Sequence, residues 1–315
     1  MVCQVEIPEA ESRYKENKLF NIVPIFKLGI KETSNAIKGY MTIPIENFNG
    51  AKVEKGNILG AAQRAAKIIL FETKFSDNES FPIGLVSKQN ITENVNLNLN
   101  FTPYFSKGLP DSDVWDKQFS PAIACVKNAL VQKKVASLRL YAFAHLSLGF
   151  LYGYVFRERT GFKLEIEQIS KGKRNIWKTD AIQEEALLNM TPLDGELNSS
   201  NLCIKINLMS EDNNSFCSYV KKSGLSYRVL LEISPPNYPY IISNGQAVAI
   251  AKQLAQQIKE IHAKYGTNSV HIFAAIPLGL ALLIGYNLNA CGKIQCYEFD
   301  NPSREYFPSC ILGNQ

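Results

Sequence analysis

Residues 269–300 read SVHIFAAIPLGLALLIGYNLNACGKIQCYEFD, and residues 137–168 read SLRLYAFAHLSLGFLYGYVFRERTGFKLEIEQ. Shifted by 132 residues (269 minus 137), the two stretches share identical residues, among them Ser137/Ser269, Ala142/Ala274, Leu146/Leu278, Leu148/Leu280, Gly153/Gly285 and Tyr154/Tyr286. Each stretch opens with an apolar run rich in aromatic and β-branched residues, which is typical of a strand buried on both faces. A helical stretch with Gly and Ala follows, and then a second β-rich run. The repeat therefore predicts a strand–helix–strand unit made twice.

Two such units predict the fold class. Strand–helix–strand crossovers join parallel strands in a right-handed sense, and such sheets bind ligands where their strands end. We expect an α/β protein with two Rossmann-like, parallel-sheet halves in a pseudo-two-fold arrangement, residues 93–182 and 198–315, that hold a ligand between them. Residues 1–92 fall outside the repeat, and we expect a small β-rich N-terminal domain there with one helix at 57–67. Its candidate strands are the apolar runs at 19–30, 39–45, 68–75 and 82–88.

A membrane-spanning helix is the alternative for the second copy. Residues 270–288 are close to the length that crosses a bilayer, and they contain one His and one Asn. However, Pro277 and Gly279 interrupt the run where a strand-to-helix turn needs them. The first copy carries Arg157 and Glu158 near its end, and charge is costly inside a bilayer. We therefore favour a buried strand–helix unit over a two-helix membrane protein.

The overall composition is that of an ordinary globular protein, with 315 residues, 46% hydrophobic and 20% charged. The net charge of +5 suits an anionic ligand, but no basic patch of the kind that binds DNA stands out. Seven Cys and three His have no zinc-site spacing, so neither a metal nor a cofactor is predicted. Residues 1–21 lack the apolar core of a signal peptide, which predicts a cytoplasmic protein with reduced thiols.

The segments outside the repeat follow one order in both halves. A helix is predicted from Ser120, with Pro121 at a favoured N-terminal position, and it leads into the first copy. Residues 202–209 and 227–233 read as strands. Residues 246–265 read as an amphipathic helix that leads into the second copy. Each half is thus expected to run helix, strand, helix, strand.

The remaining segments read as connections. Residues 181–200 are a polar connection, and residues 301–315 are expected to form an extended tail on the sheet. The segment that follows the first copy is basic, with Lys173 and Arg174 close to Trp177. A basic loop with an indole binds a phosphate and stacks a base, or else it is a solvated loop whose Trp is packed in the core.

One short motif in the N-terminal region suggests an enzyme. Glu72-Thr73-Lys74 has the E-x-K form of metal-dependent nucleases, in which carboxylates bind Mg²⁺ and a Lys supports the attacking hydroxide. The second acid there is either Glu46 or Glu54. Three-residue matches are common, and an alternating strand places Glu72 and Lys74 on one solvated face without any metal. A ligand-gated nuclease is the alternative function; otherwise no catalytic residue is predicted.

The two copies resemble a known sensor family. The matching residues are the first copy with the following Trp177, and the second copy with its Tyr297-Glu298-Phe299-Asp300 ending. Over roughly residues 95–310 the chain resembles the SAVED domain, a sensor module of bacterial CBASS anti-phage signalling that is similar to two fused CARF-type Rossmann halves.

The resemblance implies a function and partners. It implies binding of a cyclic oligonucleotide, a tri- or tetranucleotide, made by a cognate nucleotidyltransferase. Binding then drives formation of a homo-oligomer or filament and activates an effector, on the same chain or on a separate protein. Residues 1–92 are too few for a TIR effector, and they contain no His for an HNH nuclease.

Elementary electrostatics suggests where such a ligand would bind. Helix N-termini bind phosphates through their N–H donors and the helix dipole, and the two repeat helices are expected to begin at His145 and Pro277, directly after strands. Residues 144–147 and 276–279 would then be paired cradles, while Gly153 and Gly285 are expected to serve packing. His145 is either a ligand contact or a residue at the edge of the core, and Trp177, Tyr238 and Tyr240 either stack on bases or are packed. The expected ligand-binding residues are Ala144, His145, Leu146, Ser147, Lys173, Arg174, Trp177, Tyr238, Tyr240, Ile276, Pro277, Leu278 and Gly279.

Overall fold

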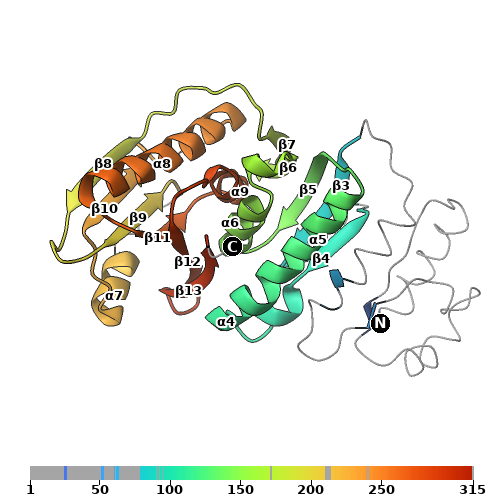
Figure 1. The fold of residues 1–315 in the computed structure, drawn as a ribbon, viewed down its shortest axis with the longest axis horizontal. Helices are drawn as coiled ribbons and strands as arrows, with labels where there is room; N and C mark the ends of the chain where they lie inside the picture. The colour runs from blue at the N-terminus through green and yellow to red at the C-terminus, as the bar shows by residue number, and fades with distance from the viewer. Residues whose placement is uncertain are drawn as a thin grey trace, which may run out of the picture.

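The computed structural model describes most of the chain from residue 79 onwards. The described residues are 25–26, 51–52, 60, 62–63, 79–89, 91, 93, 95–170, 172–209, 214–238, 240 and 242–313. Within them, two sheets flank a central group of helices (Figure 1). A separate two-residue pair joins β1 (Ile25–Phe26) to β2 (Ala51–Lys52) in parallel. The other elements expected before residue 79 lie outside the described residues.

The first sheet has five strands in the order β4-β3-β5-β6-β7. Neighbouring strands are parallel except for β7, which pairs antiparallel with β6. The strands are β3 (Phe81–Val86), β4 (Leu97–Asn100), β5 (Ser137–Phe143), β6 (Lys163–Ser170) and β7 (Lys173–Lys178).

The second sheet has six strands in the order β13-β12-β11-β9-β10-β8. Its four inner strands are parallel, and both edge strands, β8 and β13, are antiparallel to their neighbours. The strands are β8 (Asn189–Asp194), β9 (Asn201–Asn207), β10 (Val229–Ser234), β11 (Ser269–Ala275), β12 (Lys293–Asp300) and β13 (Glu305–Leu312).

The same topology therefore occurs twice. The order β7-β6-β5-β3-β4 in the first sheet corresponds to β13-β12-β11-β9-β10 in the second. The two repeat units are β5–α6–β6 and β11–α9–β12, where α6 is Leu146–Val155 and α9 is Leu278–Asn287. Both crossovers join parallel neighbours. The predicted α/β class with two Rossmann-like halves is confirmed.

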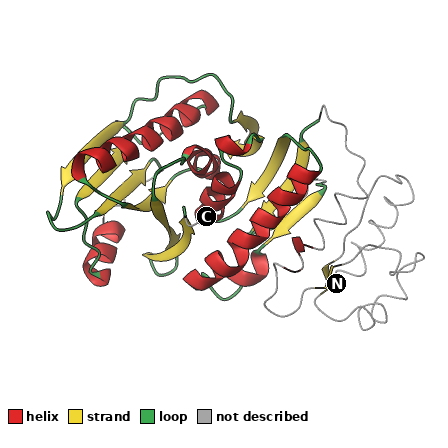
Figure 2. Ribbon diagram, in the orientation of Figure 1, coloured by secondary structure: helices red, strands yellow, loops and turns green. Residues whose placement is uncertain are grey.

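Four of the longer helices form one row that packs against the two sheets (Figure 2). Helices α5 (Ser120–Gln132), α6, α9 and α8 (Asn244–Tyr265) pack against one another in that order. Helix α7 (Asn214–Ser223) packs on the other face of the second sheet, where Phe216 joins a small aromatic cluster with Phe273. Short helical turns lie at η2 (Thr102–Phe105), α4 (Ser112–Val114), η3 (Trp115–Phe119) and η4 (Glu158–Thr160).

The longest helix has clear start and stop signals. At the start of α8, the Ser243 hydroxyl accepts a hydrogen bond from the Gln246 N–H at 3.1 Å. The Gln246 side chain in turn accepts one from the Ser243 N–H at 3.0 Å. This reciprocal capping box satisfies two N–H donors at the helix start. Gly266, with φ of +67°, ends the helix in the left-handed conformation that glycine adopts most readily.

The first sheet crosses the domain boundary that the sequence predicts at 92/93. Strand β3 was expected, at 82–88, but as part of the N-terminal region. It pairs with β4 on one side and β5 on the other, and Ile83 and Leu85 are fully buried in the shared core. Its counterpart in the second half is β9, and this equivalence exists only in the topology, because the sequence repeat starts at residue 137. Whether the residues before 79 form a domain of their own stays a prediction.

Two segments expected to be irregular are strands instead. The basic loop after the first copy is a hairpin made by β6 and β7, and part of the polar connection at 181–200 is the edge strand β8. Both strands are rich in polar residues and mostly exposed. Strands β7 and β8 are held in their sheets largely by backbone hydrogen bonds to one neighbouring strand. A hydrophobic pattern in the sequence therefore does not predict them.

The membrane alternative for residues 270–288 is wrong. The run is divided between a strand, β11, and a helix, α9, whose N-cap residue is Pro277. Across the described residues, no helix combines the length and the apolar character that crossing a bilayer requires.

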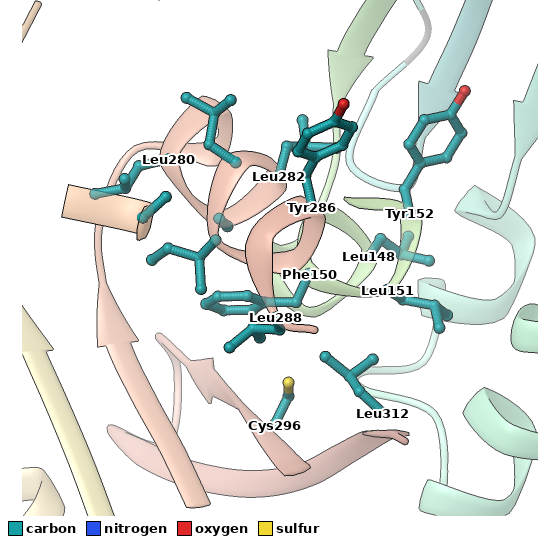
Figure 3. Close-up of a cluster of buried hydrophobic side chains, with 14 of the residues drawn as sticks. Leu148, Phe150, Leu151, Tyr152, Leu280, Leu282, Tyr286, Leu288, Cys296 and Leu312 are labelled. Carbon is teal, nitrogen blue, oxygen red and sulfur yellow. The ribbon is translucent and has the colours of Figure 1, made fainter. Parts of the chain in front are cut away.

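The two repeat helices, α6 and α9, cross at very short range. A Cβ added at Gly153 would lie 2.1 Å from the Leu282 carbonyl oxygen, and one added at Gly285 would lie 2.2 Å from the Phe150 carbonyl oxygen. Figure 3 shows the side chains of both helices around this crossing, together with Cys296 and Leu312 of the second sheet. Equivalent glycines of the repeat thus make reciprocal backbone contacts, and their expected packing role is confirmed.

This crossing predicts an unusual response to alanine. At an exposed position in a helix, replacing Gly by Ala raises the free energy of unfolding by about 1 kcal/mol. Here Gly153→Ala would push a methyl group against the backbone of α9, so we expect it to lower the free energy of unfolding by roughly 1–3 kcal/mol. Urea denaturation followed by circular dichroism measures the change.

A matched control adds one heavy atom at an exposed helix position. Ala263→Ser on α8 is expected to change the free energy of unfolding by less than about 0.5 kcal/mol. A Gly153→Ala protein as stable as the wild type would show that the helices are not in this close contact.

Candidate ligand-binding cleft

A cleft of about 700 Å³ opens where the strands of both sheets end. Its walls come from both halves, because residues on or just after β3, β5, β6 and β7 of the first half line it together with residues of the second half from β9 to β13. From the first half it is lined by Lys88, Ala144, Leu146, Gln168, Ile169 and Trp177. From the second half it is lined by Asn207, Leu208, Met209, Tyr240, Ile242, Ala274, Ala275, Ile276, Pro277, Leu278, Glu298, Phe299, Asn301 and Tyr306.

The lining combines aromatic, apolar and polar groups. The aromatic side chains are Trp177, Tyr240, Phe299 and Tyr306. Among the described residues that line the cleft, Lys88 is the one cation and Glu298 the one acid. Ligand pockets of 300–1,000 Å³ that are mostly apolar with a few placed polar groups are the usual form of small-molecule sites. The cleft is therefore the candidate binding site of this chain.

Seven of the predicted site residues line this cleft. They are Ala144, Leu146, Trp177, Tyr240, Ile276, Pro277 and Leu278. Gly279 lines a smaller cavity of about 170 Å³ that shares Lys88, Gln168 and other residues with the cleft. Ala144, Leu146, Ile276, Pro277 and Leu278 lie near the ends of β5 and β11, where parallel sheets present their binding edge.

Trp177 is both a core residue and a cleft residue. Its side chain is only 5% exposed and belongs to the main hydrophobic core. A Cβ added at Gly279 would lie 2.8 Å from the indole ring, so the small residue at the start of α9 is required by this packing. The indole therefore borders the cleft while nearly all of its surface is buried.

His145 is packed outside the cleft lining. Its ring nitrogen Nδ1 lies 2.7 Å from the Ser87 hydroxyl, and its ring stacks on Phe105 with centroids 4.0 Å apart. Burial, helped by the positive charge of Lys88, lowers the pKa of His145 to about 4. At neutral pH the ring is thus uncharged, which suits a residue at the edge of the core.

The other expected contacts also lie away from the cleft. Lys173 and Arg174 are exposed on β7, and the Arg174 guanidinium pairs with Glu167 at 2.9 Å and with Glu93. Tyr238 donates a hydrogen bond to the Asn207 carbonyl oxygen at 2.8 Å and lines a separate cavity of about 250 Å³. Glu72, Lys74, Glu46 and Glu54, named for a nuclease, lie outside the described residues.

The N-terminus of α6 is already occupied by a carboxylate. Glu298, at the end of β12 in the other half, accepts hydrogen bonds from the Ser147 N–H at 2.8 Å and the Leu146 N–H at 3.3 Å. The Ser147 side chain is buried and accepts a hydrogen bond from Ser309 at 2.7 Å. Burial raises the pKa of Glu298, while these N–H donors and nearby Lys88 act to lower it. Glu298 is only 4% exposed, and it is one of the residues that line the cleft.

The N-terminus of α9 is occupied in the equivalent way by a neutral group. Gln168, near the end of β6, accepts a hydrogen bond through Oε1 from the Gly279 N–H at 2.9 Å. Ser147 and Gly279 are equivalent positions of the repeat, so each half supplies the group that caps the helix of the other. The predicted phosphate cradles at 144–147 and 276–279 thus have partners within the chain for these N–H groups.

Comparison with known proteins identifies the family. The family model of the SAVED domain, described as the SMODS-associated and fused to various effectors sensor domain, matches residues 120–312, more than half of the chain. The chain belongs to the SAVED family. The doubled topology and the cleft between its halves are therefore features of a sensor domain of this family.

Solved structures with this fold are similar to the chain at low identity. The Acinetobacter baumannii Cap4 SAVED/CARF-domain-containing receptor with the cyclic trinucleotide 3′3′3′-cAAA has a TM-score of 0.61 and 19% identity. The match covers 75% of this chain and 52% of the receptor. The Moraxella osloensis Cap4 SAVED/CARF-domain-containing receptor has a TM-score of 0.57 and 17% identity, with 81% of this chain and 54% of the receptor covered.

A curated relative is CD-NTase-associated protein 4 of Enterobacter hormaechei subsp. hoffmannii (strain UCI 50). It is 22% identical over 191 residues, which are 59% of this chain and 37% of the relative. The chain thus spans little more than a third of this relative and about half of each receptor.

The buried histidines predict a pH-dependent stability. His271 resembles His145, because burial lowers its pKa to about 4, and its Nδ1 lies 2.8 Å from the Tyr297 hydroxyl. In the unfolded chain both rings take up protons near pH 6.5, whereas in the folded chain they stay neutral down to about pH 4. The free energy of unfolding should therefore fall as the pH drops from about 6.5 to about 4.

Urea denaturation at several pH values in this window measures the effect. The double variant His145→Asn/His271→Asn should show a shallower dependence than the wild type, whatever its stability at pH 7. Equal slopes for the two proteins would mean that these histidines do not stay neutral in the fold.

Proposed function

We propose that the chain is a receptor for a cyclic oligonucleotide in bacterial CBASS anti-phage signalling. The observation that carries the proposal is the aromatic-lined cleft of about 700 Å³ to which both halves contribute. Membership of the SAVED family supports it, as do similar receptors whose structures contain the cyclic trinucleotides 3′3′3′-cAAA and 2′3′3′-cAAA.

The chemistry of the lining fits such a ligand. Aromatic faces and edges contact nucleobases, and stacking of this kind is favourable for every base. Lys88 is placed to bind a phosphate, and Gln168, Asn207 and Asn301 carry amide groups that both donate and accept hydrogen bonds. A cyclic trinucleotide is the favoured ligand and a cyclic tetranucleotide the next candidate, in each case made by a cognate nucleotidyltransferase.

The proposed role of the site is signalling rather than catalysis. Ligand bound between two halves favours the arrangement of the halves that it fits best, which is how a binding event shifts a population. A head-to-tail contact between copies then gives a homo-oligomer or filament, and the assembly activates an effector on the same chain or on a partner protein. The cytoplasm is the proposed location, because Cys203, Cys217, Cys291, Cys296 and Cys310 are free thiols, as in reducing compartments.

Calorimetric titration with cyclic di-, tri- and tetraadenylates tests the binding step. We expect the trinucleotide to bind, and Lys88→Ala to weaken its affinity roughly tenfold, because a charge-assisted contact to phosphate is lost. Lys252→Ala, at an exposed position on α8, is the matched control and should leave the affinity unchanged. Absence of binding to any cyclic oligonucleotide, in a panel extended to mixed bases and linkages, would sink the proposal.

Light scattering of the protein with and without the cyclic oligonucleotide tests whether ligand binding drives oligomerisation. The mass of the particles should rise when the ring is added and should stay constant for Lys88→Ala at the same ring concentration. A mass that does not change at saturating ligand would leave a receptor without ligand-driven assembly.

A further inference from the structure

The two helix caps that meet at the cleft differ in charge. The cap of α6 is a carboxylate, Glu298, and the cap of α9 is a neutral amide, Gln168. Both residues line the cleft, and each reaches its helix from the opposite half. A symmetric ring that entered the cleft would thus meet an anion on one side and an uncharged group on the other.

Glu298 is held firmly in its position. Both of its oxygens accept backbone N–H groups, Oε1 from Leu146 and Oε2 from Ser147. It is 4% exposed, and this burial raises its pKa, while the two N–H donors, the Ser147 hydroxyl and Lys88 favour the ionised form. A buried carboxylate is costly unless it is hydrogen-bonded in this way. The fixed geometry means that its direction toward the cleft is set before any ligand arrives.

The carboxylate also keeps unused acceptor capacity. An ionised carboxylate offers about four lone-pair sites; the α6 N–H groups use two of them and the Ser147 hydroxyl a third. The remaining site can accept only a hydrogen-bond donor, and a phosphate oxygen in the same place would be repelled. The ring phosphates carry no donor, so the donors that a cyclic oligoribonucleotide can present to Glu298 are its free ribose hydroxyls and the N–H groups of its bases; of these, only the base N–H groups differ from one base to another.

From this geometry we infer that Glu298 is a specificity-determining residue, which excludes phosphate from the first-half helix and reads an N–H donor on the edge of one base. This inference rests on the proposed function. Gln168 marks the side of the cleft where no charge opposes a phosphate. Glu298 therefore selects the orientation in which the ring binds and the base edge that the ring presents to the carboxylate.

The test compares two rings that differ in one group. The probes are 3′3′3′-cAAA and the corresponding ring of purine riboside, which has the same phosphates and purine stacking surface but no N–H donor on the base. The wild type should bind the adenine ring at least tenfold more tightly. In Glu298→Gln the amide oxygen can keep the hydrogen bond from the Ser147 N–H, while the NH₂ replaces the oxygen that accepts from Leu146 and offers no acceptor to a base, so the difference between the rings should shrink to threefold or less.

Gln168→Glu is the matched control, because it places a carboxylate on the equivalent cap of α9. It should weaken the binding of both rings by a similar factor and leave their ratio unchanged, since an added charge opposes phosphate whatever the base. Thermal unfolding of each variant checks that the fold is intact. If Glu298→Gln does not fold, equal affinity of the wild type for the two rings still overturns the inference.

The outcomes separate this inference from the proposed function. Wild-type binding to both rings with equal affinity, or a Glu298→Gln protein that keeps the full preference for adenine, would overturn the role of Glu298 and leave the receptor proposal in place. Failure of the wild type to bind any cyclic oligonucleotide in the extended panel would overturn both.

Discussion

The backbone contact between α6 and α9 is the constraint on which the rest of the described structure depends. Gly153 and Gly285 let each helix approach the carbonyl oxygens of the other, and no larger side chain fits there. Because each helix is the crossover of its own sheet, this contact sets how the two sheets face one another. The cleft lies at the ends of the strands that precede these helices, so its width follows from the same contact.

The polar counterpart of that contact is the exchange of helix caps. Glu298 of the second half satisfies the N-terminus of α6, and Gln168 of the first half satisfies that of α9. Each cap joins the halves beside the ligand site, so a ligand that moves one half relative to the other must also strain or break these hydrogen bonds. Because backbone N–H groups buried without partners are costly, the caps favour one arrangement of the halves in the absence of ligand. That is a physical basis for a cleft that responds to what it binds.

Part of this structure can be predicted from the sequence. The repeat at 137–168 and 269–300 predicts the parallel crossovers, the two halves and the edge at which the cleft opens, since these follow from local hydrophobic pattern and chain direction. Predicted contacts adjacent to the repeat helices, such as Leu146 and Pro277, line the cleft for the same reason. His145 does not, because its ring has a partner, Ser87, that is 58 residues earlier in the chain. The sequence pattern likewise does not show that β3 joins the first sheet, because its pairing with β5 is long-range.

The sequence alone determined the strand–helix–strand unit, its duplication and the small residues at the helix crossing, because each of these is a local property of hydrophobic pattern and residue size. Only the tertiary structure decided which polar groups line the cleft. From the sequence alone, the N-termini of α6 and α9 look like open anion-binding sites. In the structure, Glu298 caps α6 through Ser147, which is 151 residues away in sequence, and Gln168 caps α9 through Gly279, which is 111 residues away. Such partners meet only when both sheets are packed, since a helix end accepts whichever acceptor the fold brings to it.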